Sequence, residues 1–150
     1  MKRFESSLTM GNLVRVGIFE IKDVLPFVVR DKRDAGAIRS YGEHKVKMWS
    51  MRYQTFQKSL SCGSCGVTGQ YFALEKCADD PGTRFHFNLY AKTANGDEVL
   101  ITKDHIFPKS KGGGNGLSNM QTMCKVCNEM KRDKMETERS CNDRAIQNES

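Results

Sequence analysis

Apolar positions alternate in some segments of the chain and recur at helical spacing in others. Residues 14–29, VRVGIFEIKDVLPFVV, mix alternation with a short apolar run that a proline interrupts, which predicts one or two strands. Residues 30–41 are charged and contain glycine, as is typical of a connector. From Glu43 onward, apolar residues recur at spacings of 3 and 4, which predicts an amphipathic helix of about four to five turns. The residues on its apolar face are Val46, Trp49, Tyr53, Phe56 and Leu60.

The second half of the chain predicts a β-hairpin followed by a loop and a helix. Residues 84–92, RFHFNLYAK, alternate, and residues 98–102 form the return strand after Asn95-Gly96, the strongest short hairpin signal. Pro108 and a run of three glycines predict a long irregular loop, beyond which residues 117–123 return to the core. Residues from Val126 to about 136 have helical composition. The polar segment after them predicts a mobile tail.

Composition changes this picture in two respects. Lysine and arginine exceed aspartate and glutamate by 24 to 18 in 150 residues, and the net charge of +6 favours a polyanionic partner such as nucleic acid. A merely solubilising surface explains the same charge equally well. No apolar run reaches the length of a membrane helix and the N-terminus lacks an apolar signal core, so a cytoplasmic location is expected.

Four of the six cysteines form two Cys-x-x-Cys pairs separated by 58 residues, Cys62 with Cys65 and Cys124 with Cys127. Four soft thiolates suit tetrahedral Zn²⁺, and such a site has no open coordination position, so the predicted zinc is structural. It would join the end of the predicted helix to the start of the C-terminal helix. Cys77 and Cys141 are expected to be free thiols.

Asp104 and His105 follow the return strand of the hairpin. Histidine is the side chain best suited to taking up a proton near neutral pH, which is what a general base does. Neighbouring strand residues point to opposite faces, so a twist or bulge is expected if both are to serve one site. Taken alone, an Asp-His pair is more often a surface or core feature.

Four motifs in order resemble the HNH endonuclease family, and small zinc-containing members encoded by phages in particular. The motifs are Asp104-His105-Ile106, Pro108-Lys109-Ser110-Lys111-Gly112-Gly113, Leu117-Ser118-Asn119-Met120-Gln121 and Cys124-x-x-Cys127-Asn128-x-x-Lys131. The resemblance implies an α+β fold with a ββα-metal core, here combined with a four-cysteine zinc site, an N-terminal strand and helix extension and an inserted β-hairpin.

The resemblance also implies roles for individual residues. His105 would activate water, Asp104 and Asn128 would hold one catalytic Mg²⁺ or Mn²⁺, and Asn119 would hydrogen-bond across the loop to orient His105. Oxygen ligands favour these ions over a catalytic Zn²⁺ or Ni²⁺. The expected substrate is DNA, most simply double-stranded. Basic residues close to the site in sequence are candidate DNA contacts: Lys109, Lys111, Lys131, Arg132 and Lys134.

The expected organisation is an N-terminal part, 1–42, packed on or flanking a zinc-stabilised nuclease domain, 43–136, with a tail at 137–150. Two competing functions remain at this point. One is a non-catalytic zinc module that binds nucleic acid, and the other is an accessory factor in phage DNA packaging or recombination. The sequence leaves open whether the protein forms a homodimer or works with a phage DNA-processing partner.

Overall fold

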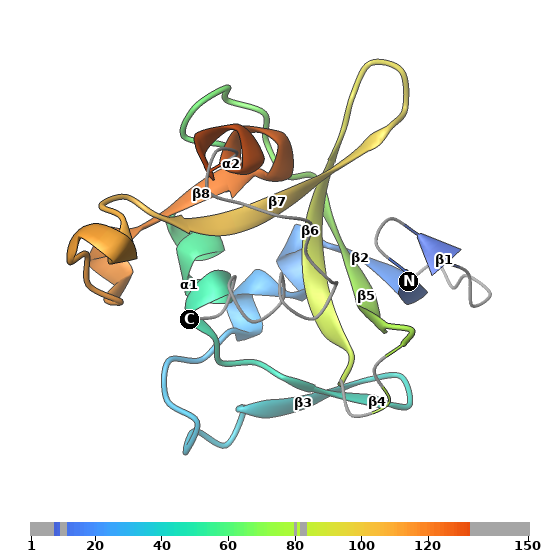
Figure 1. Ribbon diagram of the computed structural model, residues 1–150. Coiled ribbons are helices and arrows are strands. Elements are labelled where there is room, and N and C mark those ends of the chain that lie inside the picture. Colours follow the sequence, from blue (N-terminus) through green and yellow to red (C-terminus); the bar gives the residue numbers. More distant parts are fainter. Residues whose placement is uncertain (1–7, 10–11, 80, 82–83, 133–150) are drawn as a thin grey trace.

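An antiparallel sheet runs through the protein, as a computed structural model shows (Figure 1). The structure describes residues 8–9, 12–79, 81 and 84–132. Within these residues the sheet has six strands in the order β1-β2-β5-β6-β7-β8. Their bounds are β1 Leu8–Thr9, β2 Leu13–Glu20, β5 Tyr71–Cys77, β6 His86–Lys92, β7 Glu98–His105 and β8 Met120–Cys124. The fold is therefore mixed α and β, as predicted.

The predicted hairpin is confirmed as β6 and β7, which pair antiparallel from Leu89 opposite Ile101 to Lys92 opposite Glu98. Gly96 in the turn has a φ of 87°, a conformation that glycine adopts without steric cost. The Thr93 and Asp97 backbones close the turn with a 2.9 Å hydrogen bond. Strand β7 is longer than the predicted 98–102, because it continues through Asp104 and His105.

The long helix predicted from Glu43 is wrong. A second, two-stranded sheet pairs β3, Ile38–Tyr41, with β4, His44–Lys47, through a turn in which Gly42 has a φ of 64°. Helix α1 begins only at Met51 and ends at Lys58. It begins there because the Ser50 hydroxyl caps its N-terminus by accepting a hydrogen bond from the Tyr53 backbone N–H. Trp49 lies between the two elements and is half-buried, so its predicted place in the core is also wrong.

Strand β2 confirms one of the strands predicted in residues 14–29. The chain then leaves the sheet through two short 3₁₀ turns, η1 Ile21–Asp23 and η2 Leu25–Phe27, the second with Pro26 inside it. Strand β2 pairs with β5, so the N-terminal segment belongs to the same sheet as β7 and β8. Sequence reasoning missed β5, and the boundaries proposed at residues 42 and 136 stay a prediction.

The core lies between the sheet, α1 and the β3–β4 hairpin. Phe19, Tyr41 and Phe87 contact one another edge to face, with ring centroids 4.8–5.4 Å apart. The opposite face of the sheet carries Arg15, which donates to the fully buried Glu75 and, with both terminal nitrogens, to Glu98 at the start of β7. The same strand that ends in Asp104 and His105 is thus fixed at its beginning to β2 and β5.

Helix α2, Lys125–Arg132, follows β8 directly and packs on β7 (Figure 1). The predicted tail, 137–150, lies outside the described residues. Cys77 is disulfide-bonded, so its expected free thiol is wrong, whereas Cys141 lies outside the described residues. Among the described helices, none combines the length and the apolar composition that crossing a membrane requires.

Candidate active site and metal centre

Strands β7 and β8 and helix α2 form a strand–strand–helix unit that contains the predicted catalytic residues. Asp104 pairs with Gln121 and His105 with Met120, in a register that continues without interruption from Ile101 opposite Cys124. The expected bulge at Asp104-His105 is therefore absent. His105 is the last residue of β7, so the loop after it can bend without disturbing the pairing of β7 with β8.

Asp104 is buried, with 8% of its surface exposed. Its Oδ2 accepts a hydrogen bond from Lys131 Nζ at 2.6 Å and one from Gln121 Nε2 at 3.2 Å. Lys131 Nζ also donates to the His105 carbonyl oxygen at 2.9 Å. The ammonium group therefore lies at the site itself, whereas the sequence suggested only a general role near DNA.

The imidazole of His105 is half-buried, and its Nε2 lies 3.0 Å from Asn115 Oδ1. An amide oxygen accepts hydrogen bonds and does not donate them, so the contact requires the proton on Nε2. Asn115 was missed by sequence reasoning. It stands in the GGGNG run, where only the glycines attracted attention.

Asn119 holds the loop after His105 in place. Its Oδ1 accepts from the Phe107 backbone at 2.9 Å, and its Nδ2 donates to the carbonyl oxygens of Phe107 and Gly114 at 3.1 and 2.7 Å. The Asn119 carbonyl also accepts from the Ile106 backbone. These contacts cross the loop as expected, but they reach His105 only through the residues that follow it.

Asn128 lies in the first part of α2 and has 7% of its surface exposed. Its Nδ2 donates to Thr102 Oγ1 at 2.8 Å, while within the described structure its buried Oδ1 has no hydrogen-bond partner. Thr102 and Asp104 are two positions apart on β7, so they share the face of the strand toward Asn128. An unsatisfied buried acceptor on the same face as a carboxylate fits the ligand set of a hard divalent cation.

The other predicted DNA contacts lie on the loop after His105, at the end of α2 or outside the described residues. Lys109 and Lys111 belong to the exposed 3₁₀ turn η3, Lys109–Lys111. Arg132 is the last described residue of α2, and Lys134 lies outside the described residues. Lys58 of α1 donates to the carbonyl oxygens of Leu117 and Met120. Helix α1 thereby fixes the end of the same loop.

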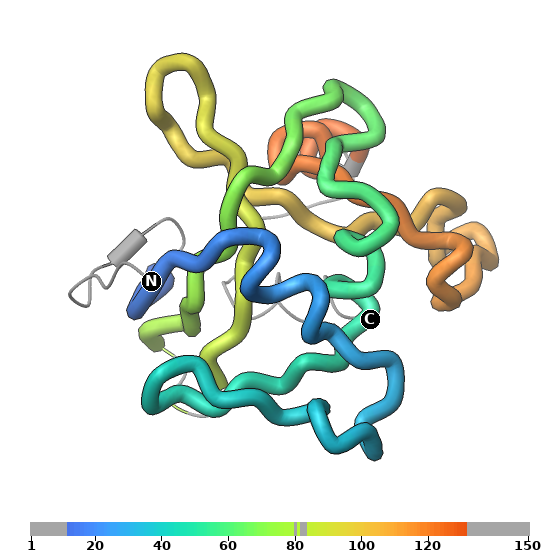
Figure 2. Tube along the Cα trace, turned by 180° about the vertical axis from the view of Figure 1, so that it is seen from behind, coloured from blue at the N-terminus to red at the C-terminus, as the bar shows by residue number. Residues whose placement is uncertain are grey.

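The four paired cysteines form one cluster. Their sulfur atoms all lie within 4.8 Å of one another, and Cys65 Sγ is 3.8 Å from Cys124 Sγ. Four thiolates at the Zn–S distance of about 2.3 Å around a tetrahedral ion would be separated by roughly 3.8 Å. The group therefore has the composition and spacing to hold a metal ion. Figure 2 shows the Cys62–Cys65 segment beside α2, although the two are far apart in sequence.

Backbone amides support the cluster. The Ser64 and Cys65 N–H groups donate to Cys62 Sγ, and the Cys127 N–H donates to Cys124 Sγ. Burial raises the pKa of Cys62, but its amide donors outweigh this and bring that pKa to about 6. Burial raises the pKa of Cys124 to about 12. Metal binding at this cluster would consequently release protons.

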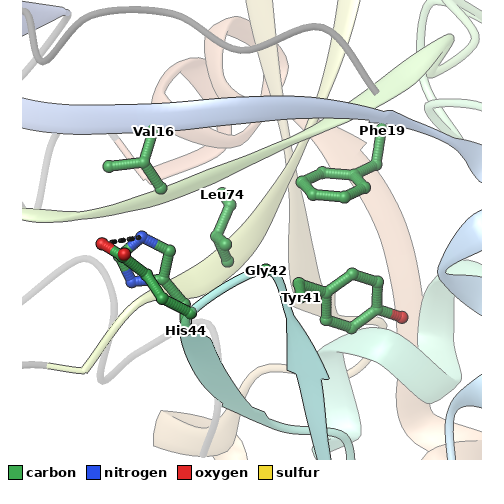
Figure 3. A pocket seen from close by; sticks show the side chains of 7 residues that line it. Val16, Phe19, Tyr41, Gly42, His44 and Leu74 are labelled. Atoms are coloured by element: carbon green, nitrogen blue, oxygen red, sulfur yellow. Dashed lines mark ion pairs between the residues drawn. The ribbon is translucent and has the colours of Figure 1, made fainter.

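A small pocket in Figure 3 lies apart from these residues. Val16, Phe19, Tyr41, Gly42, His44 and Leu74 line it together with Glu43, which makes a 3.9 Å ion pair with His44. Its volume is about 30 Å³, well below the roughly 300 Å³ at which ligand pockets begin. It is therefore too small for a nucleotide, and the chemistry concentrates at β7, β8 and α2.

A strand–strand–helix unit that carries these side chains adjoins a cysteine cluster that could hold a metal ion. Residues 91–144 match the HNH endonuclease family. The match supports a nuclease-type function that acts on nucleic acid. No curated protein and no solved structure gives a significant match to the chain. The expected likeness to phage-encoded members stays a prediction.

Proposed function

We propose that the protein is a metal-dependent DNA endonuclease that hydrolyses phosphodiester bonds. The observation that carries this proposal is that Asp104, His105 and the unsatisfied amide oxygen of Asn128 come from one strand–strand–helix unit. A non-catalytic binding module has no need for a buried carboxylate on β7 and an unsatisfied buried amide oxygen on the helix that packs on this strand. We take double-stranded DNA as the substrate, and cleavage leaves a 5′ phosphate and a 3′ hydroxyl.

His105 is the general base in this mechanism. Because Nε2 donates to Asn115 Oδ1, the lone pair lies on Nδ1, which takes the proton from the attacking water. Asn115 keeps the ring in this tautomer. Asn119 fixes Ile106 and Phe107, and so holds the backbone immediately after His105 in one conformation.

Asp104 and Asn128 are the residues that would hold a catalytic Mg²⁺ or Mn²⁺. When bound, the ion neutralises charge on the phosphate and on the leaving oxygen. Lys131 and Gln121 hold the Asp104 carboxylate in position, and the ammonium of Lys131 adds positive charge where the phosphate would lie. Thr102 fixes the Asn128 amide group through its Nδ2, so that Oδ1 keeps its orientation.

We assign zinc to the four-cysteine cluster, with a structural role. Cys124 ends β8 and Cys127 lies in the first turn of α2, whereas Cys62 and Cys65 come from the segment after α1. The ion would join this segment to the base of the helix that carries Asn128. Four protein ligands leave no position for a substrate.

A nicking assay on supercoiled circular DNA tests the proposed function. Cleavage is expected with Mg²⁺ or Mn²⁺ and is expected to stop with EDTA, and mapping the ends reports both their chemistry and any sequence preference. A protein that binds the same DNA without cutting it under any metal condition would instead be a binding module. Cutting that appears only when a partner is added would indicate an accessory factor.

Removing either proposed ligand of the catalytic ion is expected to raise the metal requirement. Asp104→Ala and Asn128→Ala should each raise the Mn²⁺ concentration for half-maximal cleavage by about tenfold or more, since even indirect metal contacts are worth that much. Calorimetry on the zinc-loaded protein measures Mn²⁺ binding directly, and the affinity should fall by a similar factor in both variants. The matched control is Asn115→Ala, which should slow cleavage without changing Mn²⁺ affinity. Unchanged Mn²⁺ affinity in both ligand variants would remove Asp104 and Asn128 as ligands.

A further inference from the structure

The loop after His105 presents two large apolar side chains to solvent, and the proposed chemistry uses neither. Ile106 is 52% exposed and Phe107 is 53% exposed, directly beside the candidate base. In Figure 1 and Figure 2 the segment between β7 and β8 projects from the body of the protein. We call these two residues the Ile106–Phe107 ridge.

The backbone of the ridge is held firmly. The amide and carbonyl groups of Phe107 both bond to the Asn119 side chain, and the Ile106 N–H bonds to the Asn119 carbonyl. Gly113 packs so closely that a Cβ atom there would lie 1.9 Å from the Phe107 carbonyl oxygen. The fixed loop therefore holds both apolar side chains outward, where a partner can reach them.

Charge around the ridge indicates the kind of partner. Lys109 and Lys111 are exposed on the turn that follows it, and the chain carries a net charge of +6. On the other side, Lys131 Nζ bonds to the carbonyl oxygen of His105, the residue before the ridge. A surface with apolar side chains between cationic groups fits DNA, whose base faces and sugars are apolar and whose phosphates are anionic.

We propose that the Ile106–Phe107 ridge enters the DNA next to the phosphate served by His105, with the Phe107 ring against a base or between two bases. This inference rests on the proposed DNA endonuclease function and adds a residue that selects where the strand is cut. Apolar side chains that enter a base step partly unstack it, and easily unstacked steps accept them at the lowest cost. The ridge would thereby favour flexible pyrimidine–purine steps.

The test uses duplex DNA with 2-aminopurine at successive positions, whose fluorescence rises when the base is unstacked. Binding is measured with the zinc-loaded, full-length His105→Ala protein as the parent, so that the DNA stays intact. The parent is expected to raise the fluorescence. Adding Phe107→Ala should remove this rise and weaken DNA binding by about tenfold, the typical effect of losing one aromatic–base contact. Phe107→Trp should retain both.

Phe27→Ala is the matched control, because Phe27 is also an exposed phenylalanine but lies in η2 against the Arg39 guanidinium. It should bind DNA and raise the fluorescence as the parent does. Suppose that the wild-type protein cuts DNA, but that the His105→Ala protein with Phe107→Ala added binds DNA and raises the fluorescence as the parent does. The ridge proposal is then wrong and the endonuclease function stands. If the parent does not bind DNA and wild-type protein does not cut it, both proposals fail.

Discussion

Replacing His105 with alanine is expected to slow DNA cleavage by about 10²- to 10⁴-fold, the usual contribution of a positioned general base. The side chain is half-buried and its imidazole bonds to Asn115, a residue of the exposed loop, so its removal should leave the sheet intact. Nicking rates at saturating Mg²⁺ measure the effect. Thermal unfolding and DNA binding should stay close to those of the wild-type protein.

His44→Asn is the control for this experiment. His44 lies on β4 in the two-stranded sheet and pairs with Glu43, so its replacement should leave the cleavage rate unchanged. Free imidazole supplies a second criterion, because it can enter the space left by His105 and accept the proton. Partial recovery of the rate by imidazole is expected for His105→Ala only. Cutting by His105→Ala at the wild-type rate would show that another group activates the water.

Short-range signals in the sequence predicted the features near the site. Asn95-Gly96 specifies a turn through the conformation of two residues, and Cys-x-x-Cys specifies a metal knuckle through the spacing of two sulfurs. Both signals need no knowledge of the rest of the chain. The hairpin was therefore predicted correctly, and the four cysteines were assigned to one cluster across 58 intervening residues.

The errors arose where one apolar pattern fits two structures. Of the five residues predicted on one apolar face, Val46, Tyr53 and Phe56 are buried, whereas Trp49 and Leu60 are only half-buried. Val46 lies on β4 and Met48 directly after it, and the two are buried at the spacing of two that a strand gives. Tyr53 and Phe56 lie on α1 and are buried at the spacing of three that a helix gives. Two residues distinguish the strand from the helix: Gly42 lies in the turn between β3 and β4, and Ser50 caps the start of α1.

Sequence reasoning also could not identify the residues that hold the catalytic side chains. Gln121 reaches Asp104 because the two face each other across β7 and β8, and Asn115 reaches His105 because the loop folds back. Neither contact follows a local period, since each depends on strand register or loop path. Thr102 is similar: it appears as an ordinary strand residue until its hydroxyl is seen to fix Asn128.

Loss of the proposed zinc should have the largest effect on stability. Structural zinc contributes about 10–16 kcal/mol of apparent binding free energy in zinc-finger peptides, as much as or more than the whole stability of a typical domain. Cys65→Ser tests this cleanly because Cys65 is exposed, so the change removes a ligand without leaving a cavity. Thermal unfolding and zinc content, measured on the same samples, should both fall steeply.

The same variant should lose DNA cleavage, and added Mg²⁺ should not restore it, because Asn128 lies on the helix that the cluster anchors. The reason is positional: Asn128 immediately follows Cys127, and its amide must stay within reach of Thr102 on β7. Lys45→Ala, a substitution of an exposed residue on β4, should keep the wild-type zinc content and melting temperature. Full zinc content and wild-type stability in the Cys65→Ser protein would show that Cys65 is not a zinc ligand, and the proposed four-cysteine site would be wrong. Loss of zinc with retained cleavage would instead separate the metal cluster from the geometry of the active site.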